Sequence, residues 1–324
     1  MASDPLLEVR HLSVSYQTTS DIIRAVRDAS LRISEGETLA LAGETGSGKS
    51  TLAQAVLGLT DGQVRVESGE ILFQGTNLRS LKPGDWKKIR SREIGIIFQD
   101  TRSALNPVLT IGSHLTETLL AHQKIPAKSA RAKAMELLQE VGIPGSYMNL
   151  YPFELSGGEC QRVGIALGIC NNPKLLIADE PTSAVDSTLQ VQILGLLQRM
   201  KERYRLALLL ISHDLPLISQ VSDRISVMYH GRIVESGLAG EVLASPAHPY
   251  TQGLIQCQPD LCHHHETHPL ATIPGSAPVS GEEVPGCPFS PRCTKSMPEC
   301  RDSVPHVREL SGTHWAACIR DDMS

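Results

Sequence analysis

Residues 43–51 combine residue types that suit phosphate binding. They read Gly-Glu-Thr-Gly-Ser-Gly-Lys-Ser-Thr and match the pattern G-x-x-x-x-G-K-[ST]. Glycines at this spacing let the backbone wrap around an anion, and the dipole of a following helix adds to the attraction. We expect Lys49 to neutralise β- and γ-phosphate charge and the Ser50 hydroxyl to ligate Mg²⁺. The candidate phosphate-site residues are Gly43, Glu44, Thr45, Gly46, Ser47, Gly48, Lys49, Ser50 and Thr51.

An acidic pair, Asp179 and Glu180, follows the apolar run Leu175–Ala178. Beside a phosphate loop, a carboxylate at the end of a strand is the usual second holder of Mg²⁺, and we assign this role to Asp179. Glu180 is next in the chain, where a base could polarise an attacking water. The two motifs predict a site for Mg·ATP or Mg·GTP, and no base-reading motif of the GTPase type is present.

The elements that must position these groups are short apolar runs. Thr38–Ala42, Leu175–Ala178 and Leu206–Ile211 each end in polar residues and are typical of buried strands. Together they predict an open α/β sheet whose site lies at the carboxyl ends of the strands. Leu7–Tyr16 and Arg24–Ile33 alternate apolar and polar residues, which predicts half-buried strands.

Helical periodicity lies between these runs. One helix is predicted over Ser129–Val141 and a second over Thr188–Tyr204. In the second helix we expect one apolar face, made of Val191, Leu194, Leu197 and Met200.

Length and charge bound the function classes. The 324 residues favour two domains, and 30 basic against 35 acidic residues give a net charge of −5, which argues against nucleic acid as a partner. The longest apolar run, Leu206–Ile211, is far shorter than a membrane span, and the N-terminus does not resemble a signal peptide. We therefore expect a soluble, cytoplasmic chain whose eight cysteines are thiols or metal ligands.

A second anion-binding turn, Leu155-Ser156-Gly157-Gly158, precedes an apolar helical run. One nucleotide does not need two such turns from one chain, so this turn makes sense if it closes over the ATP of another subunit. At these residues the sequence resembles the ATP-binding cassette (ABC) family of transporter ATPases. Glu159 stands where glutamine is commonest in that family.

The resemblance covers residues 6–250 and implies further site residues. Tyr16 resembles the aromatic residue that stacks on adenine, and Gln99 resembles the glutamine that senses Mg²⁺ and the permease. Asp186, with Ser183, matches the loop that meets the partner's nucleotide, and His213 matches the switch histidine that contacts the γ-phosphate. Catalytic roles are thus expected for Glu180, His213 and Gln99, Mg²⁺ ligation for Ser50, Gln99 and Asp179, and contact with the ATP of the partner subunit for Ser156, Gly157, Gly158 and Asp186.

The implied fold is an α/β P-loop NTPase cassette: a mixed central sheet with a RecA-like core, an antiparallel β subdomain and a helical signature subdomain. The implied mechanism is a pair of cassettes that sandwich two ATP molecules and open after hydrolysis. The implied partners are two multispanning permease subunits, a second ABC ATPase (a paralogue or a second copy) and, indirectly, an extracytoplasmic solute-binding protein. The implied location is peripheral, at the cytoplasmic face of the inner membrane.

Beyond about residue 258 the composition shifts to Pro, Gly, Ser, His and Cys. We expect a cassette domain over residues 1–258, with its helical subdomain at about 100–165, and a small C-terminal module over 259–324. The segment His248–Leu254, the pair Asn106-Pro107 and the cysteine-bearing tail resemble the oligopeptide/dipeptide/nickel importer branch of the family.

Four tail cysteines, Cys287, Cys293, Cys300 and Cys318, lie in this loop-rich segment. Their residue types leave open a [4Fe–4S] cluster, tetrahedral Zn²⁺ or reduced thiols, and the resemblance favours the cluster. A second group of soft ligands falls nearby and is typical of a solvated linker, with a transition-metal site as the alternative. That group is Cys262, His263, His264, His265 and His268.

Together these features predict an ATPase subunit of a membrane importer for di- or oligopeptides or a related small solute. The alternatives are an ATPase for import of nickel or a metal chelate, a soluble ABC ATPase of repair or translation, and a metal-sensing regulator. The absence of a coiled-coil insertion or a second cassette disfavours the soluble ATPase.

Overall fold

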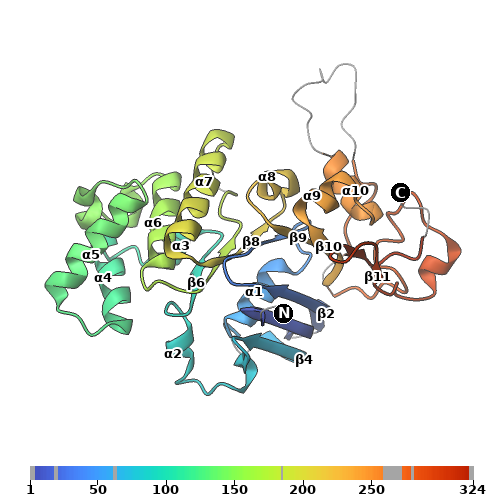
Figure 1. Ribbon diagram of the computed structural model, residues 1–324, viewed down its shortest axis with the longest axis horizontal. Helices are drawn as coiled ribbons and strands as arrows, with labels where there is room; N and C mark the ends of the chain where they lie inside the picture. Colours follow the sequence, from blue (N-terminus) through green and yellow to red (C-terminus); the bar gives the residue numbers. More distant parts are fainter. Residues whose placement is uncertain are drawn as a thin grey trace. The chain divides into compact units, whose positions relative to one another are not determined.

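The computed structural model describes residues 4–17, 21–60, 64–183, 185–257, 272–278 and 281–320. The chain divides into two compact units. Unit one consists of Met1–Leu6, Ile33–Thr38 and Gln74–Ser212. Unit two consists of Leu7–Arg32, Leu39–Phe73 and His213–Ser324. Figure 1 labels the elements of both units.

Unit one is built on parallel strands. Strand β7 (Leu175–Asp179) pairs with β6 (Ile94–Ile97) on one side and with β8 (Ala207–Ser212) on the other. Every residue of β7 and β8 is buried, as the continuous apolar runs predict for strands covered on both faces. Ile97 lies opposite Ala178, so the residues that follow β6 and β7 emerge at the same edge.

Helices α4 (Ile111–His122), α5 (Ala127–Glu140) and α6 (Gly157–Ile169) pack on one another in unit one (Figure 1). The helix predicted over 129–141 is α5, which begins two residues earlier and ends one residue earlier than expected, with Pro126 at its N-cap position. The shorter elements of unit one are β5 (Thr76–Asn77), η1 (Leu78–Ser80), α2 (Trp86–Ile89), α3 (Thr101–Ala104), η2 (Gly145–Asn149) and η3 (Pro152–Glu154).

Helix α7 (Ser187–Tyr204) confirms the second predicted helix but corrects its apolar face. Its buried residues are Ile193, Leu194, Leu196, Leu197 and Met200, whereas Val191 is 59% exposed. At about 100° per residue, Ile193, Leu196 and Met200 project on the side of the helix opposite to Val191. The predicted apolar face was therefore wrong at Val191 and correct at Leu194, Leu197 and Met200.

Unit two contains an antiparallel sheet of order β2 (Ile22–Ile33), β1 (Leu7–Gln17) and β4 (Val64–Phe73). A second set of strands in unit two belongs to another sheet. In it, β3 (Thr38–Ala42) runs parallel to β9 (Arg224–Tyr229). Strand β10 (Arg232–Leu238) follows antiparallel to β9, and the tail then adds β12 (Trp315–Ala316) and β11 (Arg308–Glu309). The C-terminal residues thus extend a sheet of unit two. Its helices are α1 (Lys49–Val56), α8 (Leu215–Ser219), α9 (Ala239–Ala244), α10 (Pro249–Gln256) and η4 (Pro298–Arg301).

The tail is fastened to unit two by a buried aromatic cluster. Phe289 of the tail lies 5.2 Å from the ring of Tyr229 and 5.4 Å from that of Tyr250, and these two tyrosine rings are 4.5 Å apart. All three side chains are buried. Large aromatic side chains in tilted or edge contact contribute strongly to a core, so this cluster holds the tail against β9 and α10.

A buried carboxylate adds a polar connection. Glu235 of β10 is fully buried and accepts hydrogen bonds of 2.8 Å from the main-chain N–H groups of Ala247 and His248. The Nε2 atom of His314 lies 2.7 Å from Oε1 of the same carboxylate. Glu235 therefore joins β10, the turn before α10 and the tail hairpin. Because a buried carboxylate must be compensated, these contacts are required for the fold of this region.

Candidate functional site

The predicted phosphate loop lies between β3 and α1 in unit two. Gly43, Gly46 and Gly48 all have positive φ angles, of 155°, 84° and 104°. A Cβ atom at Gly43 would lie 2.2 Å from the carbonyl oxygen of Met228, and one at Gly48 would lie 2.2 Å from that of Ala25. Both the turn and the close approach of neighbouring backbone therefore require glycine. No side chain caps α1, which suits an anion at its N-terminus.

The Lys49 ammonium lies inside this loop and is only 4% exposed. Its Nζ donates to the carbonyl oxygens of Gly43 at 2.7 Å and Glu44 at 2.9 Å, and it lies 3.4 Å from the hydroxyl of Ser47. The loop thus curls around one cation. This is the charge that the sequence pattern assigns to the nucleotide phosphates.

Tyr16 forms side-chain hydrogen bonds with α1, the helix that follows the phosphate loop. Its hydroxyl lies 3.0 Å from the hydroxyl of Thr51 and donates to Oε1 of Gln54 at 3.4 Å. The ring is half-buried. The structure therefore brings Tyr16 together with a phosphate-loop residue across 35 positions of sequence.

Unit one brings together Gln99 and Glu180. Asp179 is the last residue of β7 and Glu180 follows it, while Gln99 lies two residues beyond the end of β6. Nε2 of Gln99 donates to Oε2 of Glu180 at 3.1 Å. Both carboxylate residues are 8% exposed. Their placement follows from the parallel pairing of β6 and β7.

The Glu180 backbone is strained. Its φ of 44° lies in the left-handed region, which non-glycine residues rarely adopt. The conformation is held by a hydrogen bond from its N–H to the carbonyl of Ile211 at 3.0 Å and by the Ser183 hydroxyl, which donates to its carbonyl at 3.1 Å. Strain of this kind gathers at functional sites, where the surroundings over-determine one conformation.

Ser156, in the turn predicted to bind a second anion, is the N-cap of α6. Its N–H and hydroxyl both donate to Oε2 of Glu159, at 2.8 and 2.7 Å. These hydrogen bonds hold the pKa of Glu159 below its usual value. A Cβ atom at Gly158 would lie 2.3 Å from Cδ2 of Leu189, so a larger residue here would have to displace that side chain. Glutamate at this position thus closes a capping box with a negative charge.

The remaining predicted residues are placed as follows. The Asp186 carboxylate is the N-cap of α7 and accepts from the N–H of Leu189 at 3.0 Å. Its neighbour Ala184 lies outside the described residues. His213 directly follows β8 in the chain and is exposed. Gln99, Asp179, Glu180, Ser156 and Asp186 belong to unit one, whereas the phosphate loop, Tyr16 and His213 belong to unit two.

The four tail cysteines lie near one another in unit two. Cys287 and Cys300 are buried, Cys293 and Cys318 are half-buried, and the N–H of Cys287 donates to the carbonyl of Cys300 at 2.7 Å. Burial raises the pKa of Cys287 to about 11, and the other three thiols add to this rise. Among the described residues, however, no three Cys, His, Asp or Glu side chains are arranged to hold one metal ion. The predicted ligand stretch Cys262–His268 lies outside the described residues.

Sequence reasoning missed three tail contacts in unit two: Arg292 with Glu44, His314 with Glu235, and Phe289 in the aromatic cluster. One signal was available, because Glu235 is a charge in the middle of strand β10, between Val234 and Ser236 and away from its charged first residue, Arg232. Arg292 carries no comparable signal, since it lies in a Pro- and Cys-rich stretch without periodicity.

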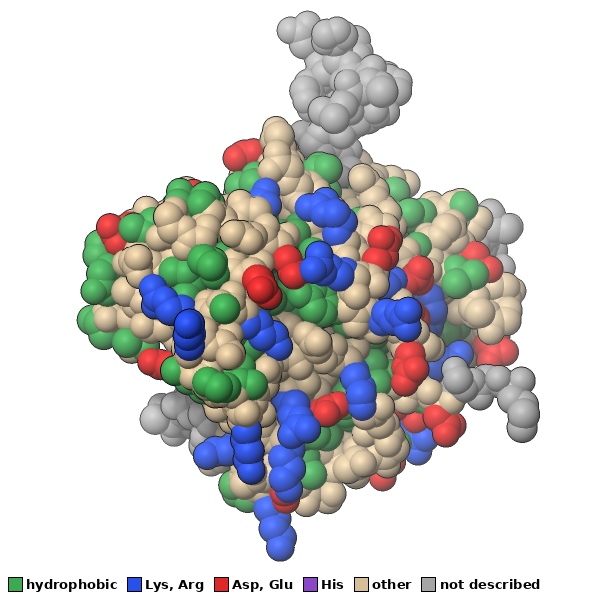
Figure 2. All heavy atoms as spheres, turned by 60° about the vertical axis from the view of Figure 1, so that its left-hand side comes forward, with side chains coloured by type: hydrophobic (Ala, Val, Ile, Leu, Met, Phe, Trp, Pro, Cys, Tyr) green, Lys and Arg blue, Asp and Glu red, His purple; other side chains and the backbone are tan. Residues whose placement is uncertain are grey.

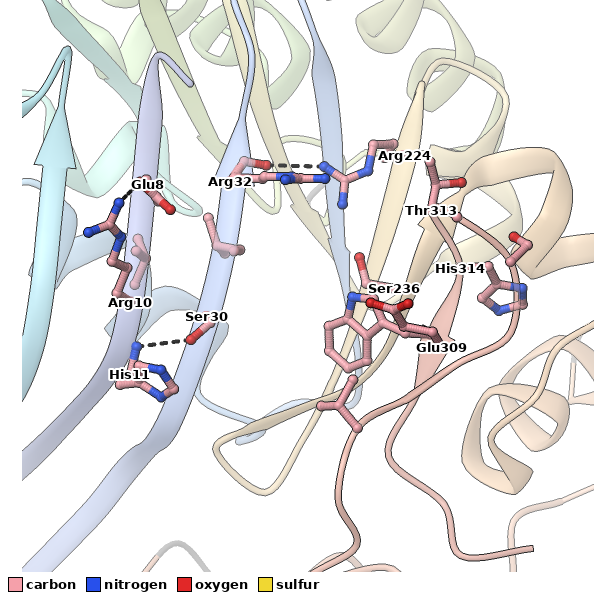
Figure 3. Close-up of a pocket in the computed structure, with 16 residues that line it drawn as sticks. Glu8, Arg10, His11, Ser30, Arg32, Arg224, Ser236, Glu309, Thr313 and His314 are labelled. Carbon is pink, nitrogen blue, oxygen red and sulfur yellow. Dashed lines mark hydrogen bonds and ion pairs between the residues drawn. The ribbon is translucent and has the colours of Figure 1, made fainter. Parts of the chain in front are cut away.

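Unit two also contains a cavity of about 530 Å³ away from the phosphate loop, between β1, β2 and the tail hairpin (Figure 3). Three of its charged side chains have protein partners: Arg10 donates to Glu8 at 2.7 Å, and Arg224 donates to the carbonyl of Arg32 at 3.3 Å. The cavity separates the antiparallel sheet from the hairpin and contains none of the predicted site residues.

The chain matches two family models. Residues 26–183 match the model described as "ABC transporter", and residues 234–300 match "Oligopeptide/dipeptide transporter, C-terminal region". The second model spans the end of the predicted cassette and most of the described tail.

Curated relatives carry peptide-transport names. The oligopeptide transport ATP-binding protein OppD of Mycobacterium tuberculosis is 43% identical over 98% of this chain, and the chain spans 52% of that protein, about half its length. A putative peptide import ATP-binding protein of Brucella abortus is 42% identical over 97% of this chain and 94% of its own length. OppD of Bacillus subtilis is 41% identical over 96% of this chain and 87% of its own.

Solved structures of ABC cassettes also resemble this chain. The dimeric ATP-binding cassette MJ0796, bound to ADP and Pi in one structure, is 28% identical with a TM-score of 0.65 over 72% of this chain and 98% of that one. The cassette cbiO1 from Clostridium perfringens is 29% identical with a TM-score of 0.65, over 75% of this chain and 92% of its own.

Proposed function

The chain belongs to the ABC transporter family, in its oligopeptide/dipeptide branch, and on this premise we propose that it hydrolyses ATP to drive peptide import across a membrane. The observation that carries the proposal is the phosphate loop curled around the buried Lys49 ammonium at the start of α1. The peptide substrate rests on the names of the relatives, which favour peptides over nickel or metal chelates.

We propose that both groups of site residues act on Mg·ATP. Lys49 and the loop N–H groups bind its phosphates, and Tyr16 stacks on the base. Ser50, Asp179 and Gln99 would hold Mg²⁺, which offsets phosphate charge when bound. Glu180 orients and deprotonates the attacking water, and His213 contacts the γ-phosphate. Support comes from the Gln99–Glu180 hydrogen bond, which fixes the carboxylate next to the proposed Mg²⁺ ligand Asp179.

The partner subunit would complete the site. In the proposal, Ser156, Gly157, Gly158 and Asp186 of one cassette contact the ATP bound by the other, in a pair made with a paralogue or a second copy. Charge-assisted hydrogen bonds from both subunits to the phosphates of ATP hold the two cassettes together. Hydrolysis of ATP removes the γ-phosphate that bridges them, so the pair opens. The similar cassette MJ0796 was solved as a dimer, which supports a paired arrangement.

A permease must supply the membrane pathway. Within the parts of the chain that the structure describes, no helix combines the length and apolar composition that crossing a bilayer requires. Unit one exposes large apolar side chains at Phe98 and Val108, close in sequence to Gln99 and to the Asn106-Pro107 pair. Figure 2 shows exposed hydrophobic side chains interspersed with charged ones on the face that it views. We propose that the stretch 98–108 receives the permease at the cytoplasmic face of the inner membrane.

The tail cysteines would hold a [4Fe–4S] cluster. Four cysteines of one loop-rich segment, Cys287, Cys293, Cys300 and Cys318, supply the number and kind of ligands that such a cluster takes, and a main-chain hydrogen bond of 2.7 Å joins Cys287 to Cys300. Anaerobic purification, with iron and acid-labile sulfide measured per chain, tests this. Four irons and four sulfides per chain support the cluster, and their absence together with one bound zinc contradicts it.

Affinity purification of the tagged chain from detergent-solubilised membranes tests the main proposal. We expect two multispanning proteins and a second cassette ATPase to be recovered with it. In proteoliposomes, the complex with its solute-binding protein should then take up labelled oligopeptide, but not nickel, in an ATP-dependent manner. Recovery of soluble proteins alone would contradict the importer function.

A further inference from the structure

Arg292 connects the tail directly to the phosphate loop. Its Nη1 and Nη2 atoms donate to the two carboxylate oxygens of Glu44 at 2.6 and 3.0 Å. The Arg292 side chain is 6% exposed and that of Glu44 is 29% exposed. A bidentate pair between guanidinium and carboxylate is among the stronger and more directional polar contacts in proteins. Glu44 is the second residue of the loop, next to Gly43 and among the residues curled around Lys49.

The guanidinium of Arg292 is itself held in place. Its Nε donates to the carbonyl of Pro274 at 2.9 Å, and Nη1 lies 3.4 Å from the Tyr229 hydroxyl. The group also lies 5.9 Å from the centre of the Tyr229 ring, within reach of a cation–π interaction. Its donors contact Pro274 and Tyr229 as well as Glu44, so a displacement of Arg292 would break these contacts. Arg292 acts as a fixed point rather than as a flexible surface arginine.

A second contact fixes the main chain of the same loop residue. The N–H of Glu44 donates to the hydroxyl of Tyr250 at 2.8 Å, and Tyr250 is fully buried. Burial raises the pKa of Tyr250, so its hydroxyl remains neutral at physiological pH. Both the backbone and the side chain of Glu44 are therefore held by residues from α10 and the tail.

The aromatic cluster gives this support its rigidity. Phe289 packs on Tyr229 and Tyr250, and the N–H of Arg292 donates to the carbonyl of Phe289 at 3.0 Å in a tight turn. Anchor and guanidinium are thus three residues apart on one short, packed segment. Loss of the pair would also leave the Glu44 carboxylate without its cation beside a site for phosphate, where like charge repels.

We propose that Arg292 and Tyr250 are positioning residues for ATP binding: they hold Glu44, and with it the first half of the phosphate loop, in the conformation that receives the phosphates. This inference rests on the proposed ATP site and adds to it residues outside the motifs of the loop. The tail would then set nucleotide affinity without touching the nucleotide.

The test measures the Kd for ATP and the steady-state kcat and KM of the full chain. Arg292→Met should raise the Kd and KM for ATP about 5- to 30-fold, the range expected for losing one charge-assisted pair, and change kcat less than about twofold. Arg292→Lys, which keeps the charge but not the fork, should recover part of the affinity. Tyr250→Phe, which removes the acceptor for the Glu44 N–H, should raise the Kd about 3- to 10-fold.

Two comparisons distinguish positioning from general damage. Arg301→Met removes an exposed arginine of the same tail and should leave the Kd unchanged. In a double-mutant cycle, Arg292→Met combined with Glu44→Gln should bind ATP more tightly than Arg292→Met alone, because the repelling carboxylate is gone. Melting temperatures of all variants check that each is folded.

The outcomes separate this inference from the proposed function. If the wild-type chain binds no ATP, the proposed function itself fails. If the wild-type chain binds ATP and folded Arg292→Met binds it within twofold of wild type, or the two substitutions are additive, the positioning role is overturned. If a variant does not fold, Arg292→Lys and Tyr250→Phe decide by the same twofold criterion.

Discussion

The side-chain amide of Gln99 donates a 3.1 Å hydrogen bond to the carboxylate of Glu180, although 81 residues separate them. The contact exists because β6 and β7 are parallel neighbours that end at one edge. A movement of the loop that carries Gln99 would therefore change the hydrogen bond that holds the carboxylate of Glu180, the proposed base. This gives a direct route by which a permease docked near residue 98 could control hydrolysis.

Replacing Glu180 with Gln should separate ATP binding from hydrolysis. The amide keeps the shape of the side chain but cannot accept a proton from water, so we expect the rate to fall about 10²- to 10⁴-fold while ATP still binds. Phosphate release and gel filtration with ATP measure the two effects, and an ATP-trapped dimer should appear. Hydrolysis at the wild-type rate would show that Glu180 is not the base.

Replacing Lys49 with Ala should remove most nucleotide affinity. The Lys49 ammonium donates hydrogen bonds to the carbonyls of Gly43 and Glu44. The substitution therefore removes the positive charge of the loop and leaves these two carbonyls without that donor. We expect ATP binding to weaken at least about 10-fold by calorimetry, as for loss of a charge-assisted contact. Lys87→Ala on α2 is the control, because Lys87 is exposed. Equal affinities in both variants would argue against the phosphate-loop assignment.

Replacing Ser156 with Arg should block pairing without affecting nucleotide binding by the single subunit. Ser156 caps α6 and lies in unit one, whereas the phosphate loop lies in unit two. A long cationic side chain at this turn would occupy the space proposed for the partner's γ-phosphate. We expect an unchanged Kd for ATP, no ATP-dependent dimer by light scattering, and hydrolysis near background. A dimer formed as readily as by wild type would contradict the proposed role of the turn.

Stability should fall as pH decreases below about 6.5, in part through His248. Burial lowers the pKa of His248 to about 3, and its Nδ1 accepts from the N–H of Tyr250, so the folded state holds it neutral. The unfolded chain binds a proton near pH 6.5, and the free energy of unfolding therefore decreases as pH falls between these two values. The contribution is about 2 kcal/mol between pH 6.5 and 5.

His248→Asn is the matched variant for this effect, since asparagine also caps a helix but does not titrate. Urea unfolding at pH 7 and pH 5 should show a smaller loss of stability in the variant than in wild type. The same loss in both proteins would mean that His248 does not contribute to the acid sensitivity.

The sequence predicted the elements with strong local signals. The buried runs became β3, β7 and β8 within a residue of the expected bounds, because continuous apolar stretches that end in polar residues have few other solutions. The tight turn of residues 43–48 also followed from its glycines, whose positive φ angles no other residue type tolerates as well.

Contacts made over long sequence separations were not predictable in this way. Arg292 and Glu44 are 248 residues apart, and neither residue type nor spacing indicates their pairing. Likewise, the exposure of Val191 depends on which side of α7 is covered, which periodicity alone did not determine. Local rules specify elements, whereas the docking of the tail follows from packing around Phe289.

The Arg292–Glu44 pair has a consequence for how this chain can be divided or recombined. A truncation at residue 258 would preserve every nucleotide-binding motif of the cassette and still remove Arg292 and Phe289. A chimera that grafts a foreign tail onto this cassette would carry the same defect unless the tail brought its own arginine. A functional segment of this protein must therefore include the tail residues that hold the phosphate loop, even though they lie beyond the last nucleotide-binding motif.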